Sequence, residues 1–162
     1  MKAISKINNT LAKIEGAVMV FWFAIVLVVM TCQVVSRYIF NAPIAWSEEF
    51  ARYSFVWISY IGCAYCVSVD AHTGITAFRD ALPPKAKKLT TVLGNVVVMI
   101  VFIRLLPIAM KFIGKNSKFL TSMMRIPFKY LYYSLPVGCV LTVVHLILKS
   151  ILLFAPDTIE QA

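Results

Sequence analysis

Long runs of apolar residues, separated by short polar segments, dominate the hydrophobic pattern of this chain. Four stretches are almost free of charged side chains, at residues 16–36, 53–69, 89–110 and 130–148. Each has about the 17 to 25 residues that a membrane-spanning helix needs. The apolar residues follow one another without the alternation expected of strands in a membrane barrel. The pattern therefore predicts four transmembrane helices, roughly at residues 15–37, 48–69, 86–110 and 127–149.

Composition supports the same class. The 162 residues are 60% hydrophobic and only 14% charged. A soluble fold of this size would leave far more apolar surface exposed than it could bury. We therefore expect an all-α integral membrane protein, with residues 1–162 in a single four-helix membrane domain.

The segment before the first span is amphipathic. Four aliphatic residues recur at helical spacing with lysines between them, namely Ile4, Ile7, Leu11 and Ile14. This pattern is typical of a helix that lies on the membrane surface. A secretory signal peptide would also place positive charge before an apolar run. This run is too long for a signal peptide, however, and residues 36–38 offer no cleavage site. We expect an amphipathic lead-in followed by an uncleaved span.

The densest charged cluster lies at the mouth of the second span. Ser47 is a candidate N-cap, Glu48 and Glu49 fall in the first helical turn, and Arg52 follows one turn later. Both carboxylates are within helical reach of the Arg52 guanidinium. The short connection from Arg37 makes the first two helices antiparallel neighbours and brings Arg37 near both acids. We expect a paired network, either as a lock between subunits or as neutralisation within the chain.

The connection between the second and third spans contains His72. A histidine here suggests a metal site or a proton relay, although a lone histidine beside the membrane surface usually hydrogen-bonds to the backbone. Residues 76–82 are expected to form a short interfacial helix that ends at Pro83 and Pro84.

The third and fourth spans carry few special residues. Arg104 lies near the far end of the third span, where it can snorkel to the surface or meet an acid from another helix. The loop that follows is strongly basic. In the fourth span, Pro136 and Gly138 predict a kink and a close helix contact.

The formal net charge of +9 does not indicate a nucleic-acid partner, because the basic residues flank the four spans. Anionic lipid headgroups are the expected partner. Three lysines precede the first span and one arginine follows it, which favours a cytoplasmic N-terminus. With four spans, both termini are then cytoplasmic.

Two kinds of membrane chemistry remain as alternatives. Cys63 and Cys66 form a C-x-x-C motif typical of quinone-linked thiol oxidoreductases, but Cys63 lies about 24 Å along its predicted helix, where a thiolate is disfavoured. A small multidrug exporter needs an acid deep within a span, whereas Glu48 and Glu49 lie at a helix mouth. The cysteines are therefore interpreted as packing residues, and no metal or cofactor site is expected.

Several short motifs recur in an order that resembles one transporter family. Along residues 10–150 they are Arg37-Tyr38, Trp46-x-Glu48-Glu49-x-x-Arg52, Trp57, Gly62, His72, Ile126-Pro127 and Leu135-Pro136-Val137-Gly138. This order resembles the small membrane subunit of the tripartite ATP-independent periplasmic (TRAP) transporters. The Cys63 and Cys66 pair is not something that the family implies.

The resemblance implies a bacterial inner-membrane protein that is not an enzyme. It implies a stable complex with a large permease subunit and transient docking of a periplasmic substrate-binding protein, during sodium-driven uptake of an organic acid. Whether the acid is a dicarboxylate or a sialic or other sugar acid stays open, as does docking on the basic third loop or the WSEE loop. The candidate subunit-interface residues are Arg37, Trp46, Glu48, Glu49, Arg52, Trp57, His72 and Arg104.

Overall fold

The computed structural model describes residues 2–69 and 84–153, with side chains at residues 4–69 and 90–152. Within these ranges the chain is helical and forms no strand, apart from one isolated bridge between Leu120 and Pro127. The helices are α1 (Lys2–Ile39), α2 (Ser47–Ser68), α4 (Pro84–Asn116), α5 (Lys129–Tyr132) and α6 (Ser134–Leu153). The four expected long helices are thus all present. His72 and the expected helix at residues 76–82 lie outside the described residues.

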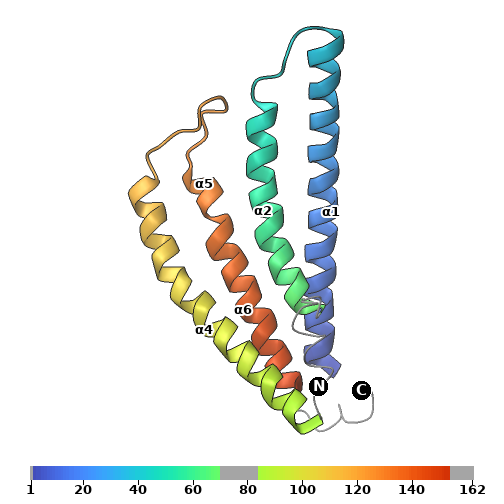
Figure 1. Ribbon diagram of the computed structural model, residues 1–162, viewed down its shortest axis with the longest axis vertical. Helices are drawn as coiled ribbons and strands as arrows, with labels where there is room; N and C mark the ends of the chain where they lie inside the picture. Colours follow the sequence, from blue (N-terminus) through green and yellow to red (C-terminus); the bar gives the residue numbers. More distant parts are fainter. Residues whose placement is uncertain (1, 70–83, 154–162) are drawn as a thin grey trace.

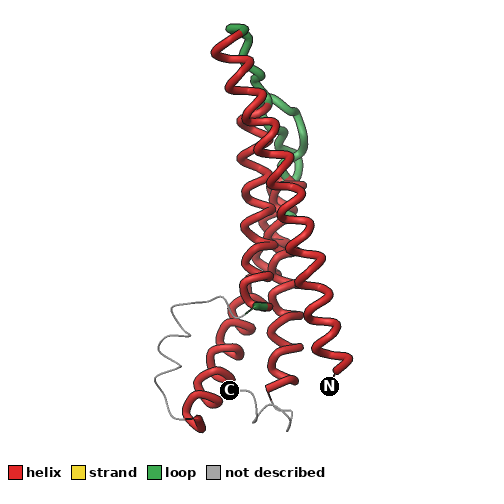
Figure 2. The backbone as a smooth tube through the Cα atoms, turned by 90° about the vertical axis from the view of Figure 1, so that its right-hand side faces the viewer, coloured by secondary structure: helices red, strands yellow, loops and turns green. Residues whose placement is uncertain are grey.

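The long helices stand side by side in one layer. From one edge to the other the order is α1, α2, α6 and α4 (Figure 1), and the layer is thin when it is turned by 90° (Figure 2). The extensive contacts are those of α2 with α6, of α1 with α2 and of α4 with α6. α1 begins and α6 ends at the same end of the layer.

This arrangement leaves both broad faces of the layer apolar and exposed. The buried hydrophobic residues of the described chain are mostly small, such as Ala51, Ala64 and Cys139, whereas Phe21, Phe40 and many other large ones are exposed. Three segments are long and apolar enough to cross a membrane, namely Ile4–Ile39, Thr90–Asn116 and Lys129–Leu152. The exposed faces are therefore suited to lipid or to a membrane partner.

Helix α2 is the least apolar of the four long helices. Its 22 residues give a length of about 33 Å, enough to cross a bilayer, but they include many serine and tyrosine residues. Ser47, Ser54 and Ser68 are buried because α2 lies between α1 and α6. Contact with neighbouring helices, rather than with lipid, explains this composition.

The amphipathic lead-in is not a separate surface element. It continues into the first span as the single helix α1, because no proline interrupts residues 2–39. Two of its polar residues face inward: Asn8 and Glu15 are buried, whereas Ile7 and Ile14 are exposed. The expected aliphatic stripe is therefore not the side of this segment that packs against the rest of the chain.

Helix α6 packs closely against α2 at Gly138. A Cβ atom on Gly138 would lie 2.7 Å from the Tyr60 Cβ and 3.0 Å from the Tyr60 carbonyl oxygen. The predicted close contact is confirmed. Pro136 has no N–H for the Tyr132 carbonyl, and the chain divides into α5 and α6 beside this position.

Substitution of Gly138 by alanine is expected to destabilise the protein. The added methyl group meets backbone that cannot move away cheaply, and such overpacking costs about 1–3 kcal/mol. Gly114→Ala is the matched control, since a Cβ there has nothing within 4 Å, and the control gains up to about 1 kcal/mol of helix propensity. Thermal unfolding in detergent tests this, and a Gly138→Ala midpoint at or above that of Gly114→Ala would contradict the packing.

Candidate functional site

The Glu49 carboxylate joins the start of α2 to the loop before α5. It accepts hydrogen bonds from the backbone N–H groups of Ser122, Met123 and Met124, at 3.1, 2.9 and 2.8 Å. The Tyr53 hydroxyl donates a fourth bond, at 2.8 Å. Successive N–H groups that converge in this way form a nest for an anion, and here the anion is a side chain of the same protein.

Local hydrogen bonds shape the loop at residues 117–128 into this nest. The Thr121 N–H donates to the Ile126 carbonyl, and the Phe128 N–H donates to the Phe119 carbonyl, both at 2.9 Å. Arg125 adopts a left-handed backbone conformation with φ of 51°, which lets the chain turn back. The loop therefore presents its tip amides to α2, while the side chain of Arg125 stays exposed.

The connection between α1 and α2 is also held by side chains. The buried Gln33 accepts a hydrogen bond from the Ile44 N–H at 2.6 Å. Asn41 has a φ of 48°, and the Ala42 N–H donates to the Ser36 carbonyl at 3.1 Å, as in a helix that ends with a left-handed residue. These contacts fix the path of residues 40–46 at the end of the layer.

The structure changes the expected pairing of the charged cluster. An Arg37 guanidinium nitrogen lies 3.8 Å from a Glu48 carboxylate oxygen, with both side chains 60% exposed, so this pair contributes little. Glu49 bonds to the loop instead of an arginine, because the amides of the nest lie within hydrogen-bond distance of its carboxylate. Within residues 4–69 and 90–152, no ion pair joins Arg52 to either acid, and the expectation that both reach its guanidinium is wrong.

Helix α2 starts at Ser47, as predicted, but Ser47 does not cap it. The residue before the first turn is Trp46, which makes no capping hydrogen bond with its side chain. The Ser47 hydroxyl donates to the Ile44 carbonyl at 2.7 Å instead. The Trp46 ring packs edge to face against Phe50, with 6.1 Å between centroids.

The other candidate interface residues lie apart from this cluster. Trp57 lines an open apolar groove of about 390 Å³ between α1 and α2, together with Trp22 and four aliphatic residues. Arg104 is exposed on α4. The cluster thus gathers Arg37, Trp46, Glu48, Glu49 and Arg52 at one end of the layer, but not Trp57 or Arg104.

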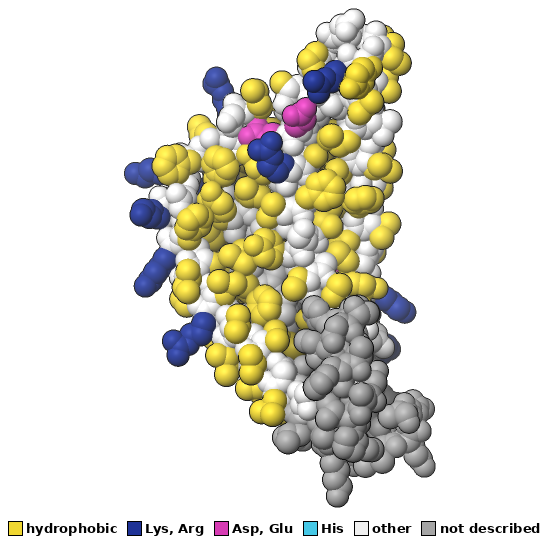
Figure 3. Space-filling view, viewed as in Figure 1, with side chains coloured by type: hydrophobic (Ala, Val, Ile, Leu, Met, Phe, Trp, Pro, Cys, Tyr) yellow, Lys and Arg dark blue, Asp and Glu magenta, His cyan; other side chains and the backbone are white. Residues whose placement is uncertain are grey.

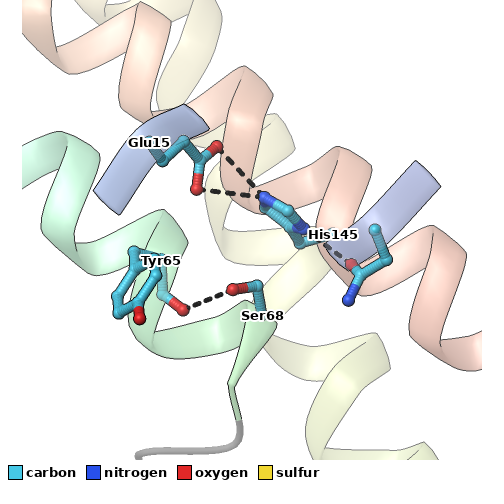
Figure 4. A network of polar contacts seen from close by, with 5 residues as sticks. Glu15, Tyr65, Ser68 and His145 are labelled. Atoms are coloured by element: carbon cyan, nitrogen blue, oxygen red, sulfur yellow. Dashed lines mark hydrogen bonds and ion pairs between the residues drawn. The ribbon is translucent and has the colours of Figure 1, made fainter. Parts of the chain in front are cut away.

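A second polar contact, which the sequence reasoning missed, lies toward the opposite end of the layer. His145 on α6 is fully buried, with Nδ1 2.8 Å from Asn8 Oδ1 and Nε2 3.0 and 3.2 Å from the two Glu15 carboxylate oxygens. Figure 4 shows Glu15 and His145 directed toward one another beside Tyr65 and Ser68 of α2. This contact joins α1 to α6 across the end of α2.

Both ring nitrogens of His145 are satisfied in this geometry. A carboxylate only accepts, so Nε2 carries a proton and donates to Glu15. The Asn8 amide can accept from Nδ1 or, turned over, donate to it.

The sequence held a signal for this contact. Asn8, Ala12 and Glu15 share one helical face, which lies beside the aliphatic residues that suggested a surface helix and away from Lys6 and Lys13. His145 is the one histidine in an otherwise apolar span, and Glu15 comes directly before one. Only Glu48 and Glu49 were considered as acids that an exporter could use, whereas Glu15 is a further acid and is buried in α1.

Metal and thiol chemistry find no support in the described part of the chain. There, no group of three or more His, Cys, Asp and Glu side chains is placed to hold a metal ion. Cys63, Cys66 and Cys139 are unbridged and lie in α2 and α6, and Cys139 is fully buried. These positions fit packing residues better than thiols that must meet a substrate.

Neutralising Glu49 is expected to release the loop at residues 117–128. Glu49→Gln loses hydrogen bonds to a charged acceptor, each worth about 1.5–3 kcal/mol, so the Ser122–Met124 amides are expected to exchange hydrogen at least roughly tenfold faster. Glu48→Gln is the matched control, because its exposed pair contributes about 1 kcal/mol or less. Hydrogen exchange with mass analysis measures both variants. Equal protection of these amides in the two variants would contradict the role of Glu49 in holding the loop.

The His145 contact is testable with a double-mutant cycle. Removing one partner of a buried pair costs about 3–5 kcal/mol, so Glu15→Ala and His145→Ala are each expected to lower the unfolding midpoint strongly. The double variant is expected to lose less than the sum of the two. Lys13→Ala, at an exposed position of α1, serves as the control. Additive losses would show that the two side chains do not interact.

Comparison with known proteins supplies the family. Residues 16–155 match the family model described as "Tripartite ATP-independent periplasmic transporters, DctQ component". The chain is 32% identical over 143 residues to the sialic acid TRAP transporter small permease protein SiaQ of Vibrio cholerae, an alignment that covers 88% of this chain and 81% of SiaQ.

Two further relatives extend the comparison. The sialic acid TRAP transporter permease protein SiaT of Haemophilus influenzae is 26% identical over 141 residues, which cover 87% of this chain and 22% of SiaT. The C4-dicarboxylate TRAP transporter small permease protein DctQ of Vibrio cholerae is 25% identical over 85 residues, covering 52% of this chain and 37% of DctQ.

These relatives are transporter permease subunits and not enzymes, which removes the thiol oxidoreductase from consideration. The multidrug exporter is also set aside, because the match to the transporter family extends over most of the chain. The motif order around Trp46 and Arg52 therefore pointed to the correct family. The chain belongs to the DctQ family of small membrane subunits of tripartite ATP-independent periplasmic transporters.

Proposed function

We propose that this chain is a static brace for a large permease subunit in a bacterial inner membrane. The assembly takes up an organic acid that a periplasmic binding protein delivers, and a sodium gradient drives the uptake. A sialic acid is the favoured substrate, because SiaQ and SiaT carry that description. A C4-dicarboxylate is the second candidate, from the more limited similarity to DctQ.

The observation that carries this proposal is the alignment with SiaT. A segment similar to this chain makes up 22% of SiaT. The other residues of SiaT lie outside this segment and can form a larger permease domain. A separate small subunit is expected to bind a separate large one in the same way. The exposed apolar faces of the layer supply enough surface for such a partner.

The large subunit is expected to cover the side of the layer where α1 meets α2. The apolar groove lined by Trp22 and Trp57 lies there, and tryptophan in a groove is a frequent centre of binding energy. Arg37 and Glu48 lie at the end of the same two helices and are exposed.

The binding protein is expected to dock at the end that carries Glu49. Lysines before the first span favour a cytoplasmic N-terminus. The Glu49 end lies at the opposite end of the layer from the N-terminus (Figure 1), so it is expected to face the periplasm. The WSEE segment and the basic loop were alternative docking surfaces, and the Glu49 bonds to Ser122, Met123 and Met124 support a single surface made of both. Lys118 and Arg125 of the loop can steer an acidic partner.

Alanine variants of the charged cluster test the brace. Glu49→Ala and Arg52→Ala are expected to lower uptake and retention of the large subunit by roughly tenfold, which corresponds to about 1.4 kcal/mol at the contact. Glu48→Ala is expected to have little effect, because its pair with Arg37 is exposed. Uptake of labelled substrate is measured at equal membrane levels, together with co-purification.

Lys6→Ala is the control, since Lys6 is exposed near the start of α1 and far along the chain from the cluster. Normal uptake and normal co-purification in all three cluster variants would contradict the role of this cluster in assembly.

A further inference from the structure

The outer edge of α4 carries a row of cations, and those on the helix itself have no part in the proposed function. Arg104, Lys111 and Lys115 are spaced by seven and four residues, which places them within a sector of about 40° on an α-helix. Lys118 follows just after the helix end. All four are exposed, and Figure 3 shows basic side chains along this edge. We call these four residues the basic edge.

The basic edge faces away from the rest of the chain. Ala109 and Ile113 are the buried residues of α4, on the side that packs against α6. Each lies about half a helical turn from Lys111. No described helix of this chain therefore covers the row of cations.

No described carboxylate is available to neutralise it. Glu15 bonds to His145, and Glu49 is held by the loop amides. Glu48 lies next to Arg37. The sequence from 84 to 153, which includes all of α4 and α6, has no Asp or Glu at all. The counter-anions of the basic edge must come from outside the described chain.

The position of Arg104 along α4 indicates what these anions are. Between Lys88 and Arg104 the charge-free run has 15 residues, a length of about 22 Å, whereas hydrocarbon is about 30 Å thick. The Arg104 backbone therefore lies below the ordinary membrane surface, and its guanidinium meets anions by snorkelling toward that surface and drawing them inward. Phospholipid headgroups move inward where a cation thins the bilayer locally.

The apolar residues beside the row fit the same ligand. Ile103, Ile108 and Phe112 are exposed on α4, between and beside the cations. A phospholipid offers a phosphate to the lysines and acyl chains to these side chains at once. A protein partner would need a matching row of acids, which are costly in hydrocarbon before assembly.

We propose that the basic edge is a binding site for an anionic phospholipid. The phosphodiester lies between Lys111 and Lys115, Arg104 draws the headgroup inward, and the acyl chains pack along Ile108 and Phe112. The lipid covers the edge of the layer that α4 forms, opposite α1. The large subunit and the lipid therefore occupy different edges.

The test uses the full chain in the membrane assembly from which it is purified, reconstituted into nanodiscs of equimolar phosphatidylglycerol and phosphatidylcholine. Native mass spectrometry measures the ratio of the two lipids that stay bound. Lys111→Gln/Lys115→Gln is expected to lower the retained phosphatidylglycerol ratio at least about fivefold, since one cation near an anionic surface changes binding by about that factor. Lys6→Gln/Lys13→Gln is the charge-matched control on α1.

Two further arms make the result decisive. Lys111→Arg/Lys115→Arg is expected to keep phosphatidylglycerol, which separates loss of charge from misfolding. Added inorganic phosphate is expected not to displace the lipid, because it has no acyl chains.

An equal fall in the control pair, or displacement by phosphate alone, would overturn the site. Loss of a co-purified protein from the glutamine variant, with its lipid ratio unchanged, would assign the basic edge to a protein partner instead.

Discussion

Glu49 bonds to three consecutive backbone amides, and the rest of the layer depends on this contact. A single row of four helices has no enclosed core, so apolar burial within the chain cannot fix how its ends are arranged. The Glu49 carboxylate fixes one end by joining α2 to the loop before α5. Glu15 and His145 join α1 to α6 toward the other end. Close packing at Gly138 joins the start of α6 to the middle of α2.

Much of the fold followed from composition and spacing. Apolar runs of sufficient length predicted the four long helices, because a bilayer sets the length of a spanning helix directly. Gly138 marked a close contact correctly, since the absence of a side chain permits close approach of two backbones. These features depend on local sequence or on the membrane, and neither requires knowledge of which helices are neighbours.

The side-chain partners could not be predicted in the same way. Glu49 was expected to meet Arg37 or Arg52, because those residues are near in sequence and opposite in charge. The partner amides lie more than 70 positions away in sequence, and a backbone nest leaves no charge pattern to detect. Asn8 and Glu15 were not singled out from the sequence, because only the position of α6 reveals that they face His145.

A flat layer is a suitable form for a subunit that supports another protein. It offers broad apolar faces to a membrane partner, and its short connections hold the helices at one end without a separate domain. In our account the side near α1 and α2 meets the large permease subunit, and the edge of α4 meets lipid. The Glu49 and Glu15–His145 contacts keep the layer in one shape while the large permease subunit transports its substrate.

The central claim is that this chain braces a large permease subunit, and its most direct test is affinity purification from the native membrane in mild detergent, with mass analysis of the proteins that accompany it. The account predicts one large, many-spanning membrane protein in a one-to-one ratio with this chain. Recovery of the chain alone, or only as a dimer of itself, would contradict the account.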